Sequence, residues 1–125
     1  MKRLFTVLLL GVGSMAALAQ TNPQAGAAPT FVASTISYRC ASGTWLQVAY
    51  LNIKNGESFA TIYFGGKLTQ LRGMDVASGA GYASLDEKMG LRWRTKGAEG
   101  ALYRLAPGSA ATEKVLLRDC KAAKN

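Results

Sequence analysis

The sequence predicts an all-β protein, a small antiparallel barrel of about eight strands held by one disulfide. Three observations support this fold class. Apolar and polar residues alternate along many short segments, and no segment of the mature chain shows the 3.6-residue apolar period of a helix. Turn-forming dipeptides separate these segments at roughly ten-residue intervals. The two cysteines, Cys40 and Cys120, flank most of the series.

The first four expected strands span residues 32–40, 45–51, 59–64 and 68–71. Tyr38 and Cys40 share one face of the first strand. In the second, Leu46, Val48 and Tyr50 share one face, and Trp45, Ala49 and Leu51 lie opposite. Residues 59–64 are aromatic and β-branched, a composition that strands prefer. Residues 68–71 form a short candidate strand.

The last four expected strands span residues 76–83, 91–96, 101–105 and 115–117. The strand 76–83 is broken by glycines. Along 91–96, apolar or small residues alternate with Arg92, Arg94 and Lys96. The expected turns between strands carry residues that tolerate positive φ or preset a turn: Ser42-Gly43, Asn55-Gly56, Gly65-Gly66, Lys96-Gly97 and Pro107-Gly108. A closed barrel of such strands leaves few exposed edges.

The N-terminal residues 1–19 have the pattern of a cleaved signal peptide. Lys2 and Arg3 precede an apolar run, and Ala17-Leu18-Ala19 presents small residues for cleavage before Gln20. The apolar run is too short to predict a stable membrane span. Residues 20–30 form an expected flexible leader rich in Ala, Pro, Gly and Asn, and residues 31–125 form a single domain.

Export and charge narrow the classes of partner. In an oxidising compartment the two cysteines should pair with each other, Cys40 with Cys120. The chain has 15 Lys and Arg against 7 Asp and Glu, which favours anionic partners, although a basic surface with no partner is equally compatible with the charge. Arginines on both sides of an aromatic residue, as Arg92 and Arg94 flank Trp93, are a pattern found in strands that bind nucleic acid. Because the protein is expected to be exported, nucleic acid is not the favoured partner.

The sequence offers little for catalysis. It contains no histidine, so the commonest general base and metal ligand are missing, and we expect no metal and no cofactor. Asp86 and Glu87 are adjacent acids in an expected exposed loop, which is typical of a solvated patch. A Ser78–Lys96 hydrolase dyad is the remaining enzymatic alternative, and it would require Lys96 to lose its proton.

Several motifs in order resemble the family of periplasmic and membrane-bound inhibitors of c-type lysozyme. The motifs are Tyr38-Arg39-Cys40, Ser78-Gly79-Ala80-Gly81-Tyr82, Thr95-Lys96-Gly97 and Cys120-Lys121. The resemblance covers residues 36–121. This chain has Gly81 where the family tends to have a basic residue, and its loop 83–90 is longer than is usual for the family.

The resemblance implies an eight-stranded barrel in the bacterial periplasm that is an inhibitor and not an enzyme. Its binding residues would be Ser78, Gly79, Tyr82, Lys96 and Gly97, with Ser78 and Lys96 inserted into the lysozyme cleft and Tyr82 supporting the loop of Ser78. An exported barrel that binds an anionic envelope glycan, a lipid or an outer-membrane partner is the alternative function. The sequence leaves open the target lysozyme, the oligomeric state and the order of the leader.

Overall fold

The protein is a closed eight-stranded antiparallel barrel in which every strand pairs with its sequence neighbours and β8 returns to β1. The computed structural model describes residues 11, 13, 28–106 and 112–124. The predicted signal peptide 1–19 and leader 20–30 lie almost entirely outside these residues, as does the predicted turn at Pro107-Gly108. Among the described residues, no helix is long and apolar enough to cross a membrane.

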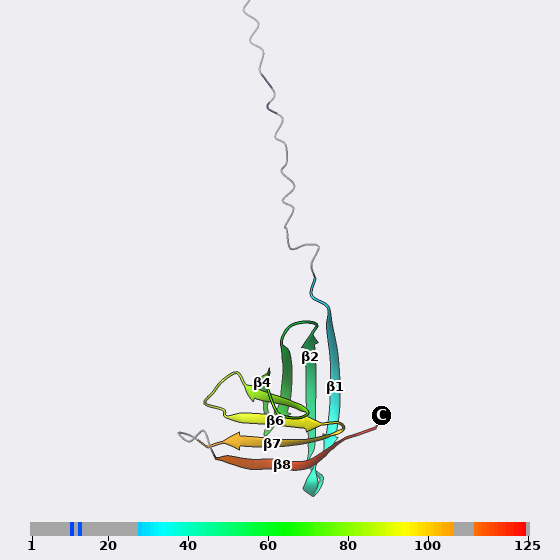
Figure 1. Ribbon diagram of the computed structural model, residues 1–125, viewed down its shortest axis with the longest axis vertical. Helices are drawn as coiled ribbons and strands as arrows, with labels where there is room; N and C mark the ends of the chain where they lie inside the picture. The colour runs from blue at the N-terminus through cyan, green and yellow to red at the C-terminus, as the bar shows by residue number, and fades with distance from the viewer. Residues whose placement is uncertain (1–10, 12, 14–27, 107–111, 125) are drawn as a thin grey trace, which may run out of the picture.

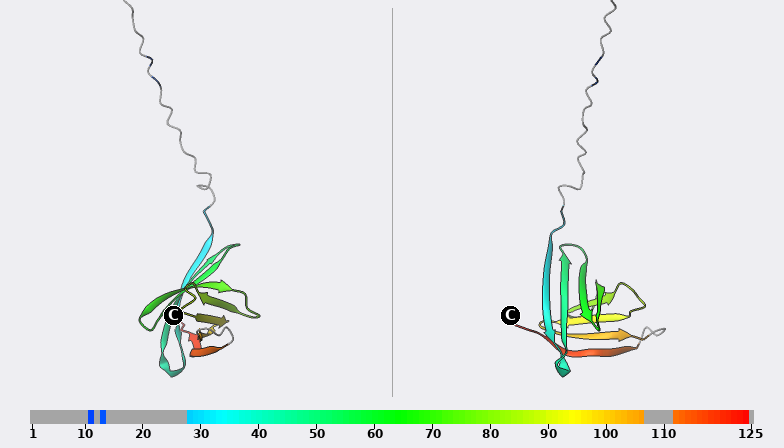
Figure 2. Two further views of the ribbon diagram at one scale, coloured as in Figure 1. Left: turned by 90° about the vertical axis from the view of Figure 1, so that its left-hand side faces the viewer. Right: turned by 180° about the vertical axis from the view of Figure 1, so that it is seen from behind.

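The strands run in the predicted order, with one short 3₁₀ turn, η1, at Ala41–Gly43 between the first two. Their bounds are β1 Phe31–Arg39, β2 Trp45–Ile53, β3 Ser58–Phe64, β4 Lys67–Met74, β5 Ala80–Ser84, β6 Leu91–Lys96, β7 Glu99–Leu105 and β8 Glu113–Ala122. Figure 1 shows β6, β7 and β8 crossing β1 and β2 at a steep angle, and the view from behind in Figure 2 agrees. The fold class predicted from the sequence is therefore confirmed.

Three strand predictions need correction. The fifth strand begins at Ala80 and not at Val76, because residues 75–79 form the irregular segment that precedes β5. β4 begins one residue before and ends three residues after the predicted 68–71, and β8 spans Glu113–Ala122 where only 115–117 was predicted. Val32 has the same orientation as Tyr38 but is 66% exposed, because β1 continues beyond the part of the barrel that other strands cover.

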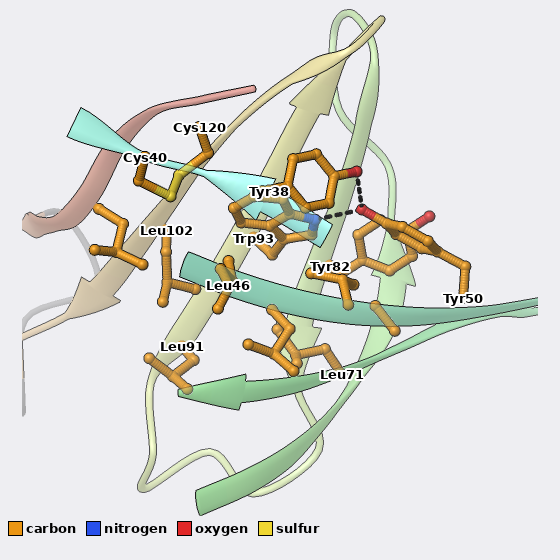
Figure 3. Close-up of a cluster of buried hydrophobic side chains, with 14 residues drawn as sticks. Tyr38, Cys40, Leu46, Tyr50, Leu71, Tyr82, Leu91, Trp93, Leu102 and Cys120 are labelled. Atoms are coloured by element: carbon orange, nitrogen blue, oxygen red, sulfur yellow. Dashed lines mark hydrogen bonds between the residues drawn. A yellow bond between two sulfur atoms is a disulfide. The ribbon is translucent and has the colours of Figure 1, made fainter. Parts of the chain in front are cut away.

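The core is aromatic at one end and aliphatic at the other (Figure 3). The Trp93 indole N–H donates to the Tyr50 hydroxyl at 2.7 Å, and the hydroxyls of Tyr50 and Tyr38 are 2.8 Å apart. The Tyr38 and Trp93 rings meet edge to face, with centroids 5.0 Å apart. The remaining large side chains that are fully buried are Leu46, Ile62, Leu71, Leu91, Leu102 and Val48. Every buried polar group of this aromatic cluster therefore has a partner.

The disulfide between Cys40 and Cys120 joins the end of β1 to β8, as the sequence predicts. β1 and β8 pair only at Tyr38↔Ala122 and Arg39↔Lys121, so this ladder is the shortest of the barrel. The disulfide lies beside these pairs, since Cys40 directly follows Arg39 and Cys120 precedes Lys121. The covalent link therefore reinforces the weakest seam of the barrel.

Candidate functional site

The segment that carries Ser78 and Gly79 lies directly against the end of β6. Ala80 is the register partner of Thr95, and Gly79 has a φ of +72°. A Cβ atom at Gly79 would lie 2.1 Å from the Thr95 carbonyl oxygen, so the two backbones approach more closely than any other residue type permits. Gly79 thereby fixes the position of Ser78 relative to the last residues of β6.

Lys96 is the last residue of β6, and the turn that follows consists of Gly97 and Ala98 and not of the predicted Lys96-Gly97. Lys96 is exposed and is the register partner of Glu99, the first residue of β7. Gly97 has a φ of +59°, and a Cβ atom there would meet nothing within 4 Å, so the glycine is used for its backbone conformation alone. The turn is held to β8 by the Ala122 N–H, which donates to the Ala98 carbonyl at 2.8 Å.

Ser78 and Lys96 line the same hollow, which has a volume of about 330 Å³. Both residues are exposed, and they come from the start of β5 and the end of β6. The other residues around the hollow are Arg94, Thr95, Glu99, Gly100, Ala101, Tyr103, Arg118 and Asp119. The structure thus brings together the two motifs that the sequence singled out, on one rim of the barrel.

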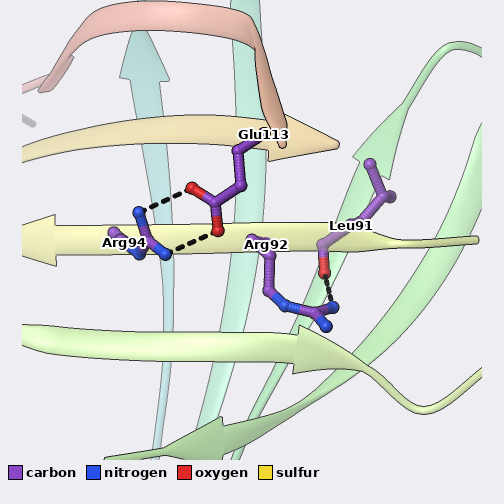
Figure 4. A network of polar contacts seen from close by, with 4 residues as sticks. All are labelled: Leu91, Arg92, Arg94 and Glu113. Carbon is purple, nitrogen blue, oxygen red and sulfur yellow. Dashed lines mark hydrogen bonds and ion pairs between the residues drawn. The ribbon is translucent and has the colours of Figure 1, made fainter. Parts of the chain in front are cut away.

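The charges of the hollow differ in how strongly they are neutralised. Arg94 donates two hydrogen bonds to the Glu113 carboxylate, at 2.8 and 2.7 Å (Figure 4). Its guanidinium lies 5.1 Å from the centre of the Tyr103 ring. Lys96 takes part in no ion pair with the described residues, whose salt bridges are Arg72–Glu57 and Arg94–Glu113. Lys96 and Arg118, which also lines the hollow without an ion pair to the described residues, are therefore the cations of this rim that stay available to a partner.

Tyr82 lies inside the barrel and not on the rim. Its ring centre is 5.7 Å from that of Tyr50, its register partner is Trp93, and it is 6% exposed. Burial raises the pKa of the Tyr82 hydroxyl. Because Tyr82 anchors β5 and Trp93 anchors β6, the two strands that carry the motifs are held by the same core.

The long loop 83–90 lies at the opposite end of the β5–β6 hairpin from Ser78 and Lys96. The Ser84 hydroxyl donates to the Asp86 carbonyl, and Asp86 accepts from the Lys88 backbone N–H, so the loop is stabilised by its own polar groups. The extra length therefore leaves the pairing of Ala80 with Thr95 unchanged. The structure also explains why position 81 is a glycine and not a basic residue, because a Cβ atom there would lie 2.5 Å from Val76 Cγ1.

The residues at this site that the sequence analysis missed belong to a bulge in β8. Leu102 pairs with Leu117 and Gly100 pairs with Cys120, so β8 has one more residue than β7 between these pairs. Asp119 takes up the irregularity with a φ of +51°. Arg118 and Asp119 thereby reach the hollow. The signal in the sequence was the spacing of Leu117 and Cys120, because residues three apart cannot both face inward on a regular strand.

The arrangement does not have the features of a hydrolytic centre. The side chains of Ser78 and Lys96 are exposed, and the structure contains no hydrogen bond between them. A Ser–Lys dyad needs a lysine that burial has stripped of its proton. Among the described residues, no group of three or more Asp, Glu or Cys residues is placed to hold a metal ion. What the rim offers a partner is hydrogen bonding and the positive charges of Lys96 and Arg118, neither of which forms an ion pair with the described residues.

Comparisons with known proteins agree with this architecture. The barrel matches the periplasmic lysozyme inhibitor of c-type lysozyme from Salmonella typhimurium with a TM-score of 0.62 and 24% identity, over 73% of this chain and 98% of that one. It matches the MliC protein of Pseudomonas aeruginosa, solved in complex with hen egg white lysozyme, with a TM-score of 0.57 and 22% identity, over 98% and 99% of the two chains. At these identities the likeness establishes the fold. The comparison with curated proteins gave no match.

A family model gives the stronger result. Residues 38–109, more than half of the chain, match the model described as membrane-bound lysozyme inhibitor of c-type lysozyme. The match includes both motifs of the rim and ends before β8. Members of this family are inhibitors and not enzymes. The chain therefore belongs to the family of membrane-bound lysozyme inhibitors of c-type lysozyme.

Proposed function

We propose that this member of the family inhibits a c-type lysozyme in the bacterial envelope by placing Ser78 and Lys96 in the enzyme's active-site cleft. The observation that carries the proposal is that the two side chains line one hollow on one rim, exposed and next to each other in space, although 18 residues separate them in the sequence. Gly79 and Gly97 supply the two backbone conformations that present them.

The chemistry of the target explains why these side chains would inhibit. Lysozyme is a retaining glycosidase that works with two closely spaced carboxyl groups. An ammonium group placed between carboxylates forms charge-assisted hydrogen bonds, which are strong in a partly dry cleft. The Ser78 hydroxyl can donate to one carboxylate and accept from another group. Occupying both carboxyl groups stops acid catalysis without any reaction of the inhibitor.

The Lys96 ammonium is suited to this role because it forms no ion pair with the described residues of the free protein. No such internal partner has to be given up when lysozyme binds, so the interaction with the cleft is not reduced by a competing salt bridge. Arg94, three residues from Gly97, is in the opposite situation, since Glu113 already occupies both ends of its guanidinium. Arg118 also lines the hollow without an ion pair to the described residues, and we assign Lys96 to the cleft because it belongs to the Thr95-Lys96-Gly97 motif.

The test is a lysis assay with lysozyme, a suspension of cell walls and the purified inhibitor. We expect saturable inhibition, a loss of about 2–4 kcal/mol of binding free energy in Lys96→Ala and about 1–2 kcal/mol in Ser78→Ala. Lys67→Ala is the matched control, because Lys67 is an exposed lysine at the start of β4 and does not line the hollow. Inhibition that survives Lys96→Ala, or falls equally in Lys67→Ala, would contradict the assignment.

Salt dependence gives a second, independent measurement. Animal c-type lysozymes are usually basic, and this chain carries a net charge of +8. Long-range repulsion should slow their association at low ionic strength. We expect the association rate to rise or stay constant as salt increases from low to physiological. A marked slowing would mean that attraction between surfaces, and not the local pairing of Lys96, controls the encounter.

A further inference from the structure

Half of β1 has a neighbouring strand on one side only. β1 pairs with β2 along its whole length, from Phe31↔Ile53 to Arg39↔Trp45. On its other side β8 reaches only Tyr38 and Arg39, and the described residues place no strand beside residues 31–36. Figures 1 and 2 show this end of β1 extending past β6, β7 and β8. The barrel is thus closed at one end of β1 and open along the other.

The hydrogen bonds at the two ends of this segment show which backbone groups are unpaired. On the β2 side, the Lys54 N–H donates to the Thr30 carbonyl at 2.9 Å, and on the β8 side the Ala123 N–H donates to the Ser37 carbonyl at 2.8 Å. Successive residues of a strand direct their backbone groups to opposite sides. Phe31, Ala33 and Thr35 therefore direct their N–H and C=O groups away from β2. We call these three residues the free edge.

The free edge lacks the features that keep exposed strands from pairing. Residues 31–36 contain no charged residue, proline or glycine, on a chain with 15 Lys and Arg. Phe31 is 58% and Val32 66% exposed. Natural sheets protect their edges with lysines, prolines and bulges. A neutral edge rich in aromatic and β-branched residues is instead typical of strands that pair with another strand.

We propose that the free edge binds the same edge of a second copy of this chain, as an antiparallel strand pair with its two-fold axis at Ala33. In this register Ala33 faces Ala33, and Phe31 of one copy faces Thr35 of the other. Every N–H and C=O group of both free edges then has a partner. The small Ala33 side chain on the axis lets the two strands reach pairing distance.

A second copy fits this edge better than a charged partner does. The edge is neutral along residues 31–36, so it offers a charged surface no complementary group, whereas an identical neutral edge matches it. An isologous contact also needs one surface patch only. The Phe31 side chain of one copy would cover Thr35 of the other and approach Ala49, which pairs with Thr35 and lines an apolar hollow with Ala33 and Leu51.

The dimer should be a weak one. The paired segment runs from residue 31 to residue 35 in each copy, which is too short to bury the area of about 1,200–2,000 Å² that is typical of stable interfaces. Both copies carry a net positive charge and repel each other at low salt. We therefore expect a dissociation constant in the micromolar range that decreases as salt is added, because salt screens the repulsion and leaves the neutral seam unaffected.

The test is sedimentation equilibrium of the exported protein, without lysozyme, from low micromolar to submillimolar concentration at two salt concentrations. Ala33→Pro removes the N–H on the axis and no β1–β2 hydrogen bond, and proline is tolerated at a strand edge. We expect it to raise the dissociation constant about tenfold or more, since the loss occurs in both copies. Ala33→Ser is the matched control that keeps the N–H, and its dimer should match that of the wild type.

A second variant and a second measurement distinguish pairing at the free edge from association through another surface. Val32→Lys changes an exposed side chain and adds a positive charge on each side of the seam, so it should also weaken the dimer. Hydrogen exchange of the Phe31, Ala33 and Thr35 amides should slow as protein concentration rises. A monomer at all concentrations, a dimer unaffected by Ala33→Pro, or amide protection that is independent of concentration, as when residues before Ala28 cover the edge, would each overturn the proposal. Because no step uses lysozyme, these outcomes are independent of the proposed function.

Discussion

Gly79 and Gly97 offer a matched pair for measuring how the rim is built. Both are exposed glycines with positive φ, +72° and +59°, beside the two side chains assigned to the cleft. An alanine at Gly97 would meet no atom within 4 Å, so Gly97→Ala should cost only the left-handed conformation, about 1–2 kcal/mol of the free energy of unfolding.

Gly79→Ala should cost more, because the structure adds a collision to the same conformational term. The new methyl group would lie 2.1 Å from the Thr95 carbonyl oxygen, where ordinary contacts begin at 3.4 Å. The atom that the methyl group meets belongs to the Thr95 backbone, so no side-chain rotation can relieve the collision. The segment that carries Ser78 must therefore move away from β6. Overpacking of this kind typically adds about 1–3 kcal/mol, which gives a total of about 3 kcal/mol.

Urea unfolding followed by circular dichroism measures both variants, and the lysis assay measures their inhibition. We expect Gly79→Ala to be about 1–3 kcal/mol less stable than Gly97→Ala and to lose at least about tenfold in inhibition, because Ser78 moves relative to Lys96. Equal stability of the two variants would refute the reasoning about the Gly79–Thr95 approach. If the two variants differ in stability but inhibit equally, the close approach of Gly79 to Thr95 is supported, and its role in positioning Ser78 for inhibition is refuted.

Three further predictions concern the core and the seam. Tyr50→Phe leaves the Trp93 indole N–H without its buried acceptor, so urea unfolding should show a loss of about 2 kcal/mol, whereas Tyr63→Phe at an exposed position should be nearly neutral. Reducing the Cys40–Cys120 disulfide should lower the free energy of unfolding by up to about 4 kcal/mol, and an unchanged urea midpoint in dithiothreitol would contradict its role in the seam. Burial raises the pKa of the Tyr50 hydroxyl, as it does for two neighbouring tyrosines, so the unfolded chain loses these protons first as the pH rises. The thermal midpoint should therefore be constant up to about pH 9 and fall above about pH 10, and a midpoint that rises there would show the opposite sign.

Local sequence patterns were sufficient to predict the barrel. Alternation along β2 placed Leu46, Val48 and Tyr50 on one face, the face that the structure buries, and glycine turns such as Gly65-Gly66 marked the strand ends. Both signals act between near neighbours in the chain. The start of β5 was mispredicted. Val76 is a β-branched residue of the kind that strands prefer, but it lies in the irregular segment before β5, where its side chain approaches Gly81. Propensity alone does not reveal where pairing with a distant strand ends.

Features that depend on pairing between strands far apart in the chain were not predicted from the sequence. The β8 bulge follows from the need for both Leu117 and Cys120 to face inward, which requires knowing that Gly100 and Leu102 lie opposite. The short ladder between β1 and β8 depends on the lengths and angles of all eight strands together. The motifs of the rim were found through the resemblance to the inhibitor family, but their common hollow depends on the close approach of Gly79 to Thr95.

The covalent link between the first strand and the last has a consequence for how the protein is made. Cys120 lies 80 residues after Cys40, in β8, so the ribosome must synthesise all eight strands before the disulfide can form. A chain that ends before Cys120 would lack the covalent link between β1 and β8 and should therefore be degraded sooner by proteases. The disulfide can form only in chains that include β8 and have reached an oxidising compartment.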